Sequence, residues 1–219
     1  MRVVIAGGHG QIALRLTKLL SASGHSVVGL VRNPAHESDI AAAGGEAAVL
    51  DLESADVEDV AKVLAGADVA VFAAGAGPGS GNERKDTVDR GAAALLADAA
   101  ERAGVRRYLQ VGSINADRAD DPDLDPDDTF TIYLKAKKAA EDDLRARDGL
   151  DWTILRPGAL TNDPGTGRVL LTDKTGFGNI TRDDVALVLA GLCETPASIG
   201  RTLELIEGDT PVAEALATL

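Results

Sequence analysis

The sequence predicts an α/β fold in which helices cover both faces of a doubly wound parallel sheet. Short apolar runs alternate with amphipathic segments along the 219 residues, and glycine or proline marks most of the boundaries between them. Strands that alternate with helices favour parallel pairing, because a parallel connection must cross the sheet and a helix supplies the crossover. Neither a repeat nor a linker divides the chain, so we expect one domain over residues 1–219.

The expected strands share β-branched or alternating apolar residues. They are residues 3–6, 26–31, 46–50, 68–72, 106–111, 151–156 and 201–206, with small outlying strands at 168–171 and 179–180. The expected helices share apolar residues at a spacing of three or four. They are residues 12–20, 34–43, 57–64, 87–103, 133–147, 181–193 and 212–219. Gly24 and Gly104 follow two of these helices, and Thr181 is the expected N-cap of another.

Composition excludes several classes of protein. The net charge is −13, from 22 basic and 35 acidic residues, which disfavours nucleic acid and anionic membranes as partners. The single cysteine, Cys193, cannot form an internal disulfide and fits a reducing compartment. No charged leader precedes the first apolar run, and no run approaches the roughly 20 residues of a membrane span. We therefore expect an acidic cytoplasmic protein.

A glycine-rich turn joins the first strand to the first helix. The run Gly7–Ala13 reads GGHGQIA and fits G-x-G-x-x-G/A from Gly8 or the looser G-x-x-G-x-x-G from Gly7, with Ala13 in the last position of both. Glycine lets a phosphate approach without a Cβ in its way, and the first turn of a helix leaves N–H donors free for an anion. This predicts a dinucleotide diphosphate site at the turn; the alternative is a glycine turn that binds nothing.

The end of the second strand predicts which dinucleotide is preferred. Arg32 and Asn33 stand where this type of fold places the residue that contacts the adenosine ribose, and no acidic residue occurs before Glu37. An arginine there suits the 2′-phosphate of NADP(H), so we expect NADP(H) to be preferred over NAD(H). The alternative is a solvated arginine at the strand end. After the third strand, Asp51 is expected to accept from the adenine amino group or to cap a turn.

Two loops follow later strands. Ala73, Ala74 and Gly75 begin a small-residue run that continues to Gly81, which leaves room for the middle of the cofactor or forms a flexible loop. The stretch 115–128 is proline-broken and strongly anionic, and three interpretations compete for it: a solvated flap, a lid over the substrate pocket, or a loose cation site. Its aspartates lack the glycine and final glutamate of a calcium loop.

Together these pieces resemble the short-chain dehydrogenase/reductase superfamily, in its compact atypical branch of NmrA-like and epimerase/dehydratase-like NAD(P)H-binding proteins. Besides the motifs above, the resemblance rests on Ser113 after the fifth strand, Tyr133-x-x-x-Lys137, residues 155–160 (LRPGAL) and residues 181–186 (TRDDVA). It implies a Rossmann-like fold with strand order 3-2-1-4-5-6-7, and a small substrate-side lobe from about residues 157–180 and 207–219.

The resemblance also implies roles for individual residues. Tyr133 would donate a proton, Ser113 would orient the substrate carbonyl, and Lys137 would hold the nicotinamide ribose. A free tyrosine titrates near pH ~10, so a cation four residues away on the same helix face would help it to exchange protons. The implied cofactor-binding residues are Gly7, His9, Gly10, Gln11, Ile12, Arg32, Asn33, Asp51, Leu52, Ala73, Ala74, Gly75, Lys137 and Pro157. The alternative for Tyr133 is a pocket wall or a surface aromatic.

We therefore expect an NADPH-dependent reductase of a small carbonyl, quinone or flavin-like acceptor. The alternatives are a redox sensor that holds NADP(H) without turnover, or a sugar-nucleotide epimerase/dehydratase. The segment after residues 151–156 has about 60 residues, which is short for the substrate lobe of such epimerases. The expected partner is a small-molecule substrate, for a monomer or homodimer. No cluster of His, Cys and carboxylate residues has metal-ligand spacing, so no metal site is expected.

Overall fold

The computed structural model describes residues 1–77 and 81–219. The strands in these residues are β1 (Arg2–Ala6), β2 (Ser26–Val31), β3 (Glu46–Val49), β4 (Val69–Phe72), β5 (Arg107–Val111), β6 (Asp151–Pro157), β7 (Ala159–Thr161), β8 (Arg168–Thr172), β9 (Asn179–Thr181), β10 (Arg201–Glu207) and β11 (Thr210–Pro211). The α-helices are α1 (Gln11–Ala22), α2 (Glu37–Ala42), α3 (Val57–Leu64), α4 (Asn82–Arg84), α5 (Ala93–Ala103), α6 (Thr129–Arg145), α7 (Arg182–Leu192) and α8 (Val212–Ala217).

Shorter turns complete the description. A π-helical segment, η2 (Lys85–Ala92), joins α4 to α5, and 3-10 turns occupy η1 (Pro34–His36), η3 (Ala116–Asp120) and η4 (Pro196–Ser198). Of the helices that the structure describes, none combines the length and the apolar character that crossing a bilayer would require.

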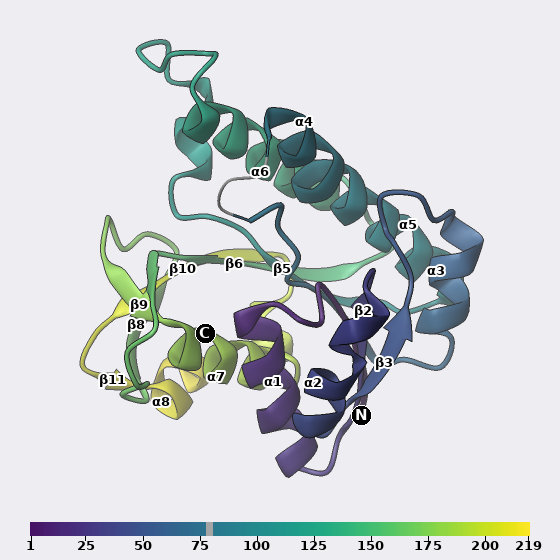
Figure 1. Ribbon diagram of the computed structural model, residues 1–219. Helices are drawn as coiled ribbons and strands as arrows, with labels where there is room; N and C mark the ends of the chain where they lie inside the picture. The colour runs from purple at the N-terminus through teal and green to yellow at the C-terminus, as the bar shows by residue number, and fades with distance from the viewer. Residues whose placement is uncertain (78–80) are drawn as a thin grey trace.

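A mostly parallel sheet organises the molecule (Figure 1). Its order among the described strands is β11-β8-β10-β6-β5-β4-β1-β2-β3, and β7 pairs separately with β9. The strands from β10 to β3 pair in parallel, whereas β8 lies antiparallel to both β10 and β11. The expected doubly wound order is therefore confirmed, with β10 as the seventh strand. The connection order reverses between β1 and β4, which is where such folds open a ligand crevice.

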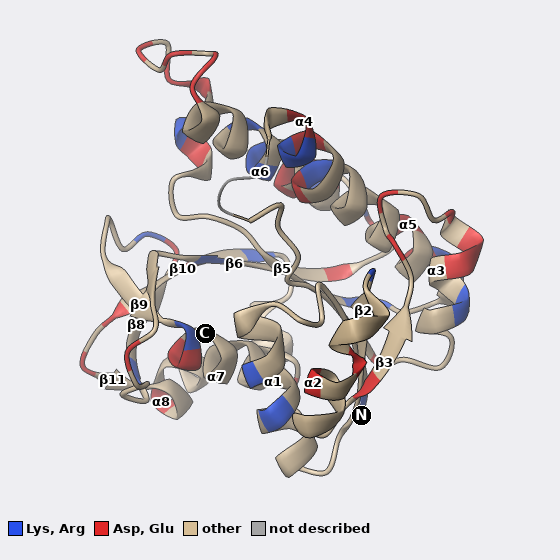
Figure 2. Ribbon diagram, viewed as in Figure 1, with Lys and Arg blue, Asp and Glu red and all other residues tan. Residues whose placement is uncertain are grey.

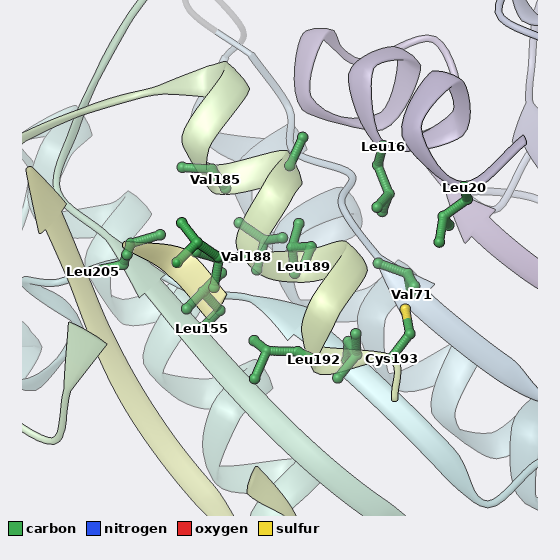
Figure 3. Packing of buried hydrophobic residues seen from close by; sticks show 14 of the residues in the cluster. Leu16, Leu20, Val71, Leu155, Val185, Val188, Leu189, Leu192, Cys193 and Leu205 are labelled. Atoms are coloured by element: carbon green, nitrogen blue, oxygen red, sulfur yellow. The ribbon is translucent and has the colours of Figure 1, made fainter. Parts of the chain in front are cut away.

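The sheet is buried on both faces, which explains its continuous apolar strands. In β1, Val3 and Ile5 point into one core and Val4 and Ala6 into the other, as alternation along a strand requires. The first core lies under α1, α7 and α8, and the second under α3, α5 and α6. Figure 3 shows side chains of α1 and α7 meeting over β4, β6 and β10 in the first core.

Several predicted boundaries were wrong in ways that affect the site. The helix expected from residue 133 begins at Thr129, because Asp128 Oδ2 accepts hydrogen bonds from the N–H groups of Phe130 and Thr131 and so caps it. Tyr133 therefore lies inside the helix and not at its start. The helix expected from residue 87 is preceded by α4, and its first part belongs to the π-helical segment η2. Residue propensities do not predict the wider turn of a π-helix.

The outer strands also differ from expectation. Residues 168–172 join the main sheet as β8 beside β10, so this strand is not an outlying one. Residues 179–181 pair with β7, a strand that was not predicted. Both pairings are long-range, and local sequence pattern carries no information about such partners.

The environment of Cys193 gives a testable consequence of this packing. The thiol lies among the α7 side chains of the first core with 6% exposure (Figure 3), and burial raises its pKa to about 12. We expect iodoacetamide at about pH 8 to leave the folded protein unlabelled, because alkylation requires an exposed thiolate. Mass spectrometry with and without guanidinium measures this; stoichiometric labelling of the native protein would contradict the packing of α7.

Candidate active site

Two adjoining cavities open at the carboxyl ends of the parallel strands. The first, here called the Arg32 cavity, has a volume of about 310 Å³ and is bordered by residues that follow β1, β2, β3 and β4. The second, the Tyr133 cavity, has a volume of about 660 Å³ and is bordered by residues that follow β4, β5 and β6. Both are lined by residues 73–76, so they form one crevice across the point where the strand order reverses.

The glycine turn is shaped by close backbone contacts. A Cβ on Gly7 would lie 2.6 Å from the Cα of Ala74, and one on Gly8 would lie 2.6 Å from the Cα of Gly29. Gly7 also has a φ of +78°, which side-chain-bearing residues seldom adopt. Only glycine lets β1 end this close to β2 and to the loop after β4.

The N-terminus of α1 faces the crevice without a cap. Gly10, the N-cap residue, supplies no side chain, and the first turn of α1 contains no acidic residue. The first N–H groups of a helix have no intrahelical acceptor, and they carry the positive end of the helix dipole. Gly7 and Gly10 line the Arg32 cavity and Ile12 lines the Tyr133 cavity, so these donors sit where the two meet. The turn therefore fits the diphosphate of a dinucleotide.

The far end of the Arg32 cavity holds two guanidinium groups around one carboxylate. Arg32 donates to Glu53 Oε2 at 3.2 Å and Arg84 donates to the same oxygen at 2.7 Å, while the Thr87 hydroxyl donates to Oε1 at 2.7 Å. The hydrogen bonds from Arg84 and Thr87 lower the pKa of Glu53, so this carboxylate remains ionised. Asp51 also lines this cavity, so the two guanidinium groups are matched by two carboxylates, and both arginines remain available as direct ligands of an anion.

Other predicted residues of the Arg32 cavity have structural partners. Asp51 Oδ1 accepts from the N–H of Glu53 at 3.1 Å, so Asp51 caps the turn and also lines the cavity. His9 lines the cavity too, with its ring stacked on His36 at a centroid distance of 3.6 Å. Its Nε2 lies 2.7 Å from Asp39 Oδ2.

Ser113, Tyr133 and Lys137 all line the Tyr133 cavity. Ser113 comes from the end of β5, and the other two lie one turn apart on α6. The acidic loop between them leads from β5 to α6, at the top of Figure 2, and its first part is anchored: Arg156 of β6 donates to both carboxylate oxygens of Asp117, at 2.7 and 2.8 Å. Those hydrogen bonds lower the pKa of Asp117 to about 2. Within the described structure, residue 128 is the part of the 115–128 stretch that lines the cavity.

Lys137 is buried with a counter-ion that the sequence did not reveal. Its Nζ lies 3.1 Å from Asp89 Oδ1, donates to the carbonyl of Val111 at 3.3 Å, and lies 5.9 Å from the centroid of the Tyr133 ring. Desolvation lowers the pKa of Lys137, but the electrostatic interactions with Tyr133 and Asp89 outweigh it, so the pKa is raised. Asp89 Oδ2 in turn accepts from the N–H of Ala76 at 3.2 Å. Asp89 thus joins the cofactor loop after β4 to α6.

A second lysine of η2 also reaches the cavity. Lys85 is 8% exposed; its Nζ donates to the carbonyl of Gly77 at 3.0 Å and lies 5.5 Å from the centroid of the Tyr133 ring. Sequence patterns did not indicate Lys85, which precedes the helix expected over residues 87–103, or Asp89, because a charged residue in an Ala-rich amphipathic helix indicates a solvated face. Their spacing of four residues places them on the same side of a helix, but it does not indicate whether that side is buried or solvated.

Most of the implied site residues line the crevice. Those in the Arg32 cavity are Gly7, His9, Gly10, Arg32, Asp51, Leu52 and the shared Ala73, Ala74 and Gly75; those in the Tyr133 cavity add Ile12, Lys137 and Pro157. Gln11 and Asn33 are absent from the lining that the structure describes, and the Asn33 side chain instead accepts from the N–H of Ala35. The predicted run Ala73–Gly81 includes residues 78–80, which lie outside the described residues.

The two segments expected to form a substrate-side lobe contact each other in the structure, because β11 pairs with β8 and the N–H of Val212 donates to the carbonyl of Gly167. Pro157, Gly158 and Leu160 line the Tyr133 cavity. In contrast, β11 and α8 pack against β8 and α7, and Val212 and Ala215 are part of the first core. The last residues of the chain thus contact both the first core and the strand β8 of the expected lobe.

Comparison with known proteins agrees with this geometry. Residues 7–196 match the family model described as NAD(P)H-binding. The chain is 36% identical to YhfK of Bacillus subtilis, an uncharacterized sugar epimerase, over the full length of both proteins. A solved structure from Bacillus halodurans, provisionally described as an NAD-dependent epimerase/dehydratase, has a TM-score of 0.91 at 34% identity, with both chains covered completely. The oxidoreductase ylbE from Lactococcus lactis has a TM-score of 0.87 at 30% identity, covering all of this chain and 96% of its own.

The fold and crevice define an NAD(P)H-binding protein of the Rossmann-like class. The chain belongs to the NAD(P)H-binding family, in the atypical branch of the short-chain dehydrogenase/reductase superfamily. The predicted family is thereby confirmed.

The ion pair between Lys137 and Asp89 gives a prediction for stability. We expect Asp89→Asn to lower the free energy of unfolding by about 3 kcal/mol at pH 7, because it leaves a buried ammonium without its counter-charge. The native pKa of Lys137 is raised, so its stabilising contribution is complete below the unfolded lysine value of about 10.4 and is lost above it. The deficit of the variant should therefore stay constant below about pH 10.4 and narrow only above it, as the pH rises towards the raised pKa of Lys137.

Urea unfolding followed by circular dichroism at several pH values measures this effect. The matched control is Asp59→Asn, which removes the carboxylate of the exposed pair between Asp59 and Lys62 and should leave the midpoint unchanged. If both variants lose the same free energy of unfolding at every pH, the buried pair between Lys137 and Asp89 contributes no more to stability than the exposed pair.

Proposed function

We propose that this protein is an NADPH-dependent reductase of a small carbonyl, quinone or flavin-like acceptor. The observation that carries the proposal is the joint presence of Ser113, Tyr133 and Lys137 on one cavity that continues into the dinucleotide crevice. The similarity to the oxidoreductase ylbE supports the same class of chemistry. The volume of the Tyr133 cavity, about 660 Å³, suits a small organic substrate beside a nicotinamide ring.

The residues of the cavity can complete a reduction in which the coenzyme supplies the hydride. Tyr133 would donate its phenolic proton to the acceptor oxygen as the charge on that oxygen develops. Ser113 would hold the same oxygen through its hydroxyl. Lys137, which keeps its positive charge in a buried position beside the tyrosine, would stabilise the phenolate that proton donation leaves behind.

Lys137 also has a donor left for the coenzyme. An ammonium group has three N–H donors, and here they face the Val111 carbonyl and the Asp89 carboxylate. Among the described residues these are its hydrogen-bond and ion-pair partners, which leaves the third donor to bind a ribose hydroxyl. Asp89 would therefore orient the lysine, and through Ala76 it would also hold the loop on which the middle of the coenzyme lies.

The proposed preference for NADPH rests on the two guanidinium groups of the Arg32 cavity. Arg32 and Arg84 share the carboxylate of Glu53, and the Arg32 side chain remains 54% exposed, so its guanidinium is accessible to a 2′-phosphate. Arg84 is a second candidate ligand for that phosphate that the sequence did not suggest.

The test of catalysis uses the two tyrosines of the chain. Purified protein with NADPH and a panel of quinones, flavins and aldehydes should consume NADPH with at least one acceptor. Tyr133→Phe should lower kcat by about 100-fold or more, through loss of the proton donor, and leave the Kd for NADPH within about twofold. Tyr108→Phe is the matched control, because Tyr108 is buried and its hydroxyl donates to the carbonyl of Ala93 away from the cavity.

Absorbance at the nicotinamide band and NADPH fluorescence give the two readouts. An unchanged kcat in Tyr133→Phe would refute the assigned proton donor. NADPH binding without oxidation by any acceptor would favour a redox sensor, and interconversion of a sugar nucleotide without net NADPH oxidation would favour an epimerase.

The test of coenzyme preference is Arg32→Ala. We expect its affinity for NADPH to fall by about tenfold, since the 2′-phosphate loses a charge-assisted contact, and its affinity for NADH to change by less than about twofold. Fluorescence titration of both reduced coenzymes measures this. Arg102→Ala is the control, because Arg102 pairs with Glu58 on the surface. Equal losses for the two coenzymes would contradict recognition of the phosphate.

A further inference from the structure

Lys85 is a nearly buried cation with neutral contacts. Its ammonium donates to the Gly77 carbonyl and lies over the face of the Tyr133 ring, and no carboxylate pairs with it among the described residues. A buried charge is stable only when an opposite charge or sufficient hydrogen bonds compensate for lost hydration. One carbonyl and one aromatic face occupy part of its surroundings, and the remaining side borders the Tyr133 cavity.

The other charged groups of the cavity already have partners. Lys137 is paired with Asp89, and Asp128 is occupied as the N-cap of α6. Arg182 at the rim donates to Asn162 Oδ1 and to the carbonyl of Leu160. The lining thus contains the three cations Lys85, Lys137 and Arg182 against the two carboxylates Asp89 and Asp128, an excess of one positive charge. This excess stands out in a chain whose net charge is −13.

The ring of Phe130 lies beside the Tyr133 ring, which Lys85 contacts. Phe130 stacks against Tyr133 at a centroid distance of 6.1 Å, lines the same cavity, and is 48% exposed. A cation next to the half-buried ring of Tyr133 and the exposed ring of Phe130 suits a ligand that joins a planar apolar body to a negative group. One excess positive charge matches a singly charged carboxylate better than a phosphate, which carries up to two negative charges near neutral pH.

We propose that Lys85 forms an anion subsite in the Tyr133 cavity, which binds the carboxylate of an aromatic or conjugated substrate. The inference deepens the proposed reductase function, on which it rests in taking this cavity as the substrate site. It defines the acceptor as a carboxylated planar carbonyl compound or quinone, held by Lys85 at one end while Tyr133 and Ser113 face the group to be reduced.

Benzoate and benzamide are the probes, because they share shape and ring but differ in charge. Ligand-detected NMR titrations of the full-length protein give both dissociation constants. Wild-type protein should bind benzoate at least fivefold more tightly than benzamide. Lys85→Met should weaken benzoate at least tenfold and leave benzamide within twofold, whereas Lys85→Arg, which keeps the charge, should retain benzoate within about threefold.

Lys135→Met is the matched control, because Lys135 is an exposed lysine of α6 outside the cavity lining. It makes the same change in net charge and should alter neither constant. Thermal unfolding of each variant confirms that the fold is retained, which the similar length of methionine favours. If Lys85→Arg and Lys85→Met both lose the binding of benzoate and of benzamide, the proposed subsite is overturned.

Three further outcomes decide the assignment. Equal binding of benzoate by Lys85→Met and wild type would overturn it. A tenfold loss of NADPH affinity in Lys85→Met, with benzoate unaffected, would overturn it too and assign the lysine to the coenzyme. Loss of benzoate selectivity in Lys85→Met, in a protein that binds NADPH and reduces no acceptor, would support the subsite and remove the reductase proposal.

Discussion

The close approach of the glycine turn to its neighbouring strands is the constraint on which the site depends. Because Gly7 and Gly8 have no side chain, the end of β1 lies against Ala74 and Gly29. This contact aims the N–H groups at the start of α1 into the crevice at the carboxyl ends of β1 and β4. Larger residues at either glycine would push α1 away from the sheet, and the two cavities would no longer meet along the loop after β4.

A second arrangement connects the coenzyme crevice to the candidate catalytic residues. The π-helical segment η2 presents Asp89 to the N–H of Ala76 on one side and to Lys137 on the other. Since π-helical turns are unfavourable in isolation, they commonly persist where they orient functional side chains. Here the wider turn aims two residues spaced by four, Lys85 and Asp89, into one cavity with opposite charges. Asp89 neutralises Lys137, and Lys85 leaves the lining of the Tyr133 cavity with one excess positive charge.

Much of the candidate site could be predicted because its chemistry depends on local sequence. The glycine turn, Arg32 at a strand end, and the spacing of Tyr133 and Lys137 are each short patterns with a physical reason for their composition. Glu53, Arg84, Lys85 and Asp89 form no such pattern. Glu53 sits beside Arg32 only because β2 and β3 are adjacent, and Arg84 reaches it from a helix that follows the next strand.

The sequence by itself determined the alternation of strands and helices, the parallel sheet, the glycine turn between β1 and α1, and the family. These properties depend on apolar periodicity and on the backbone freedom of glycine, which act over a few residues at a time. The tertiary structure alone decided that β8 joins the main sheet, that α6 begins at Thr129, and that Asp89 is the counter-ion of Lys137. Those features depend on which distant segments share a buried space, where an unpaired charge is costly and long-range packing selects the partner.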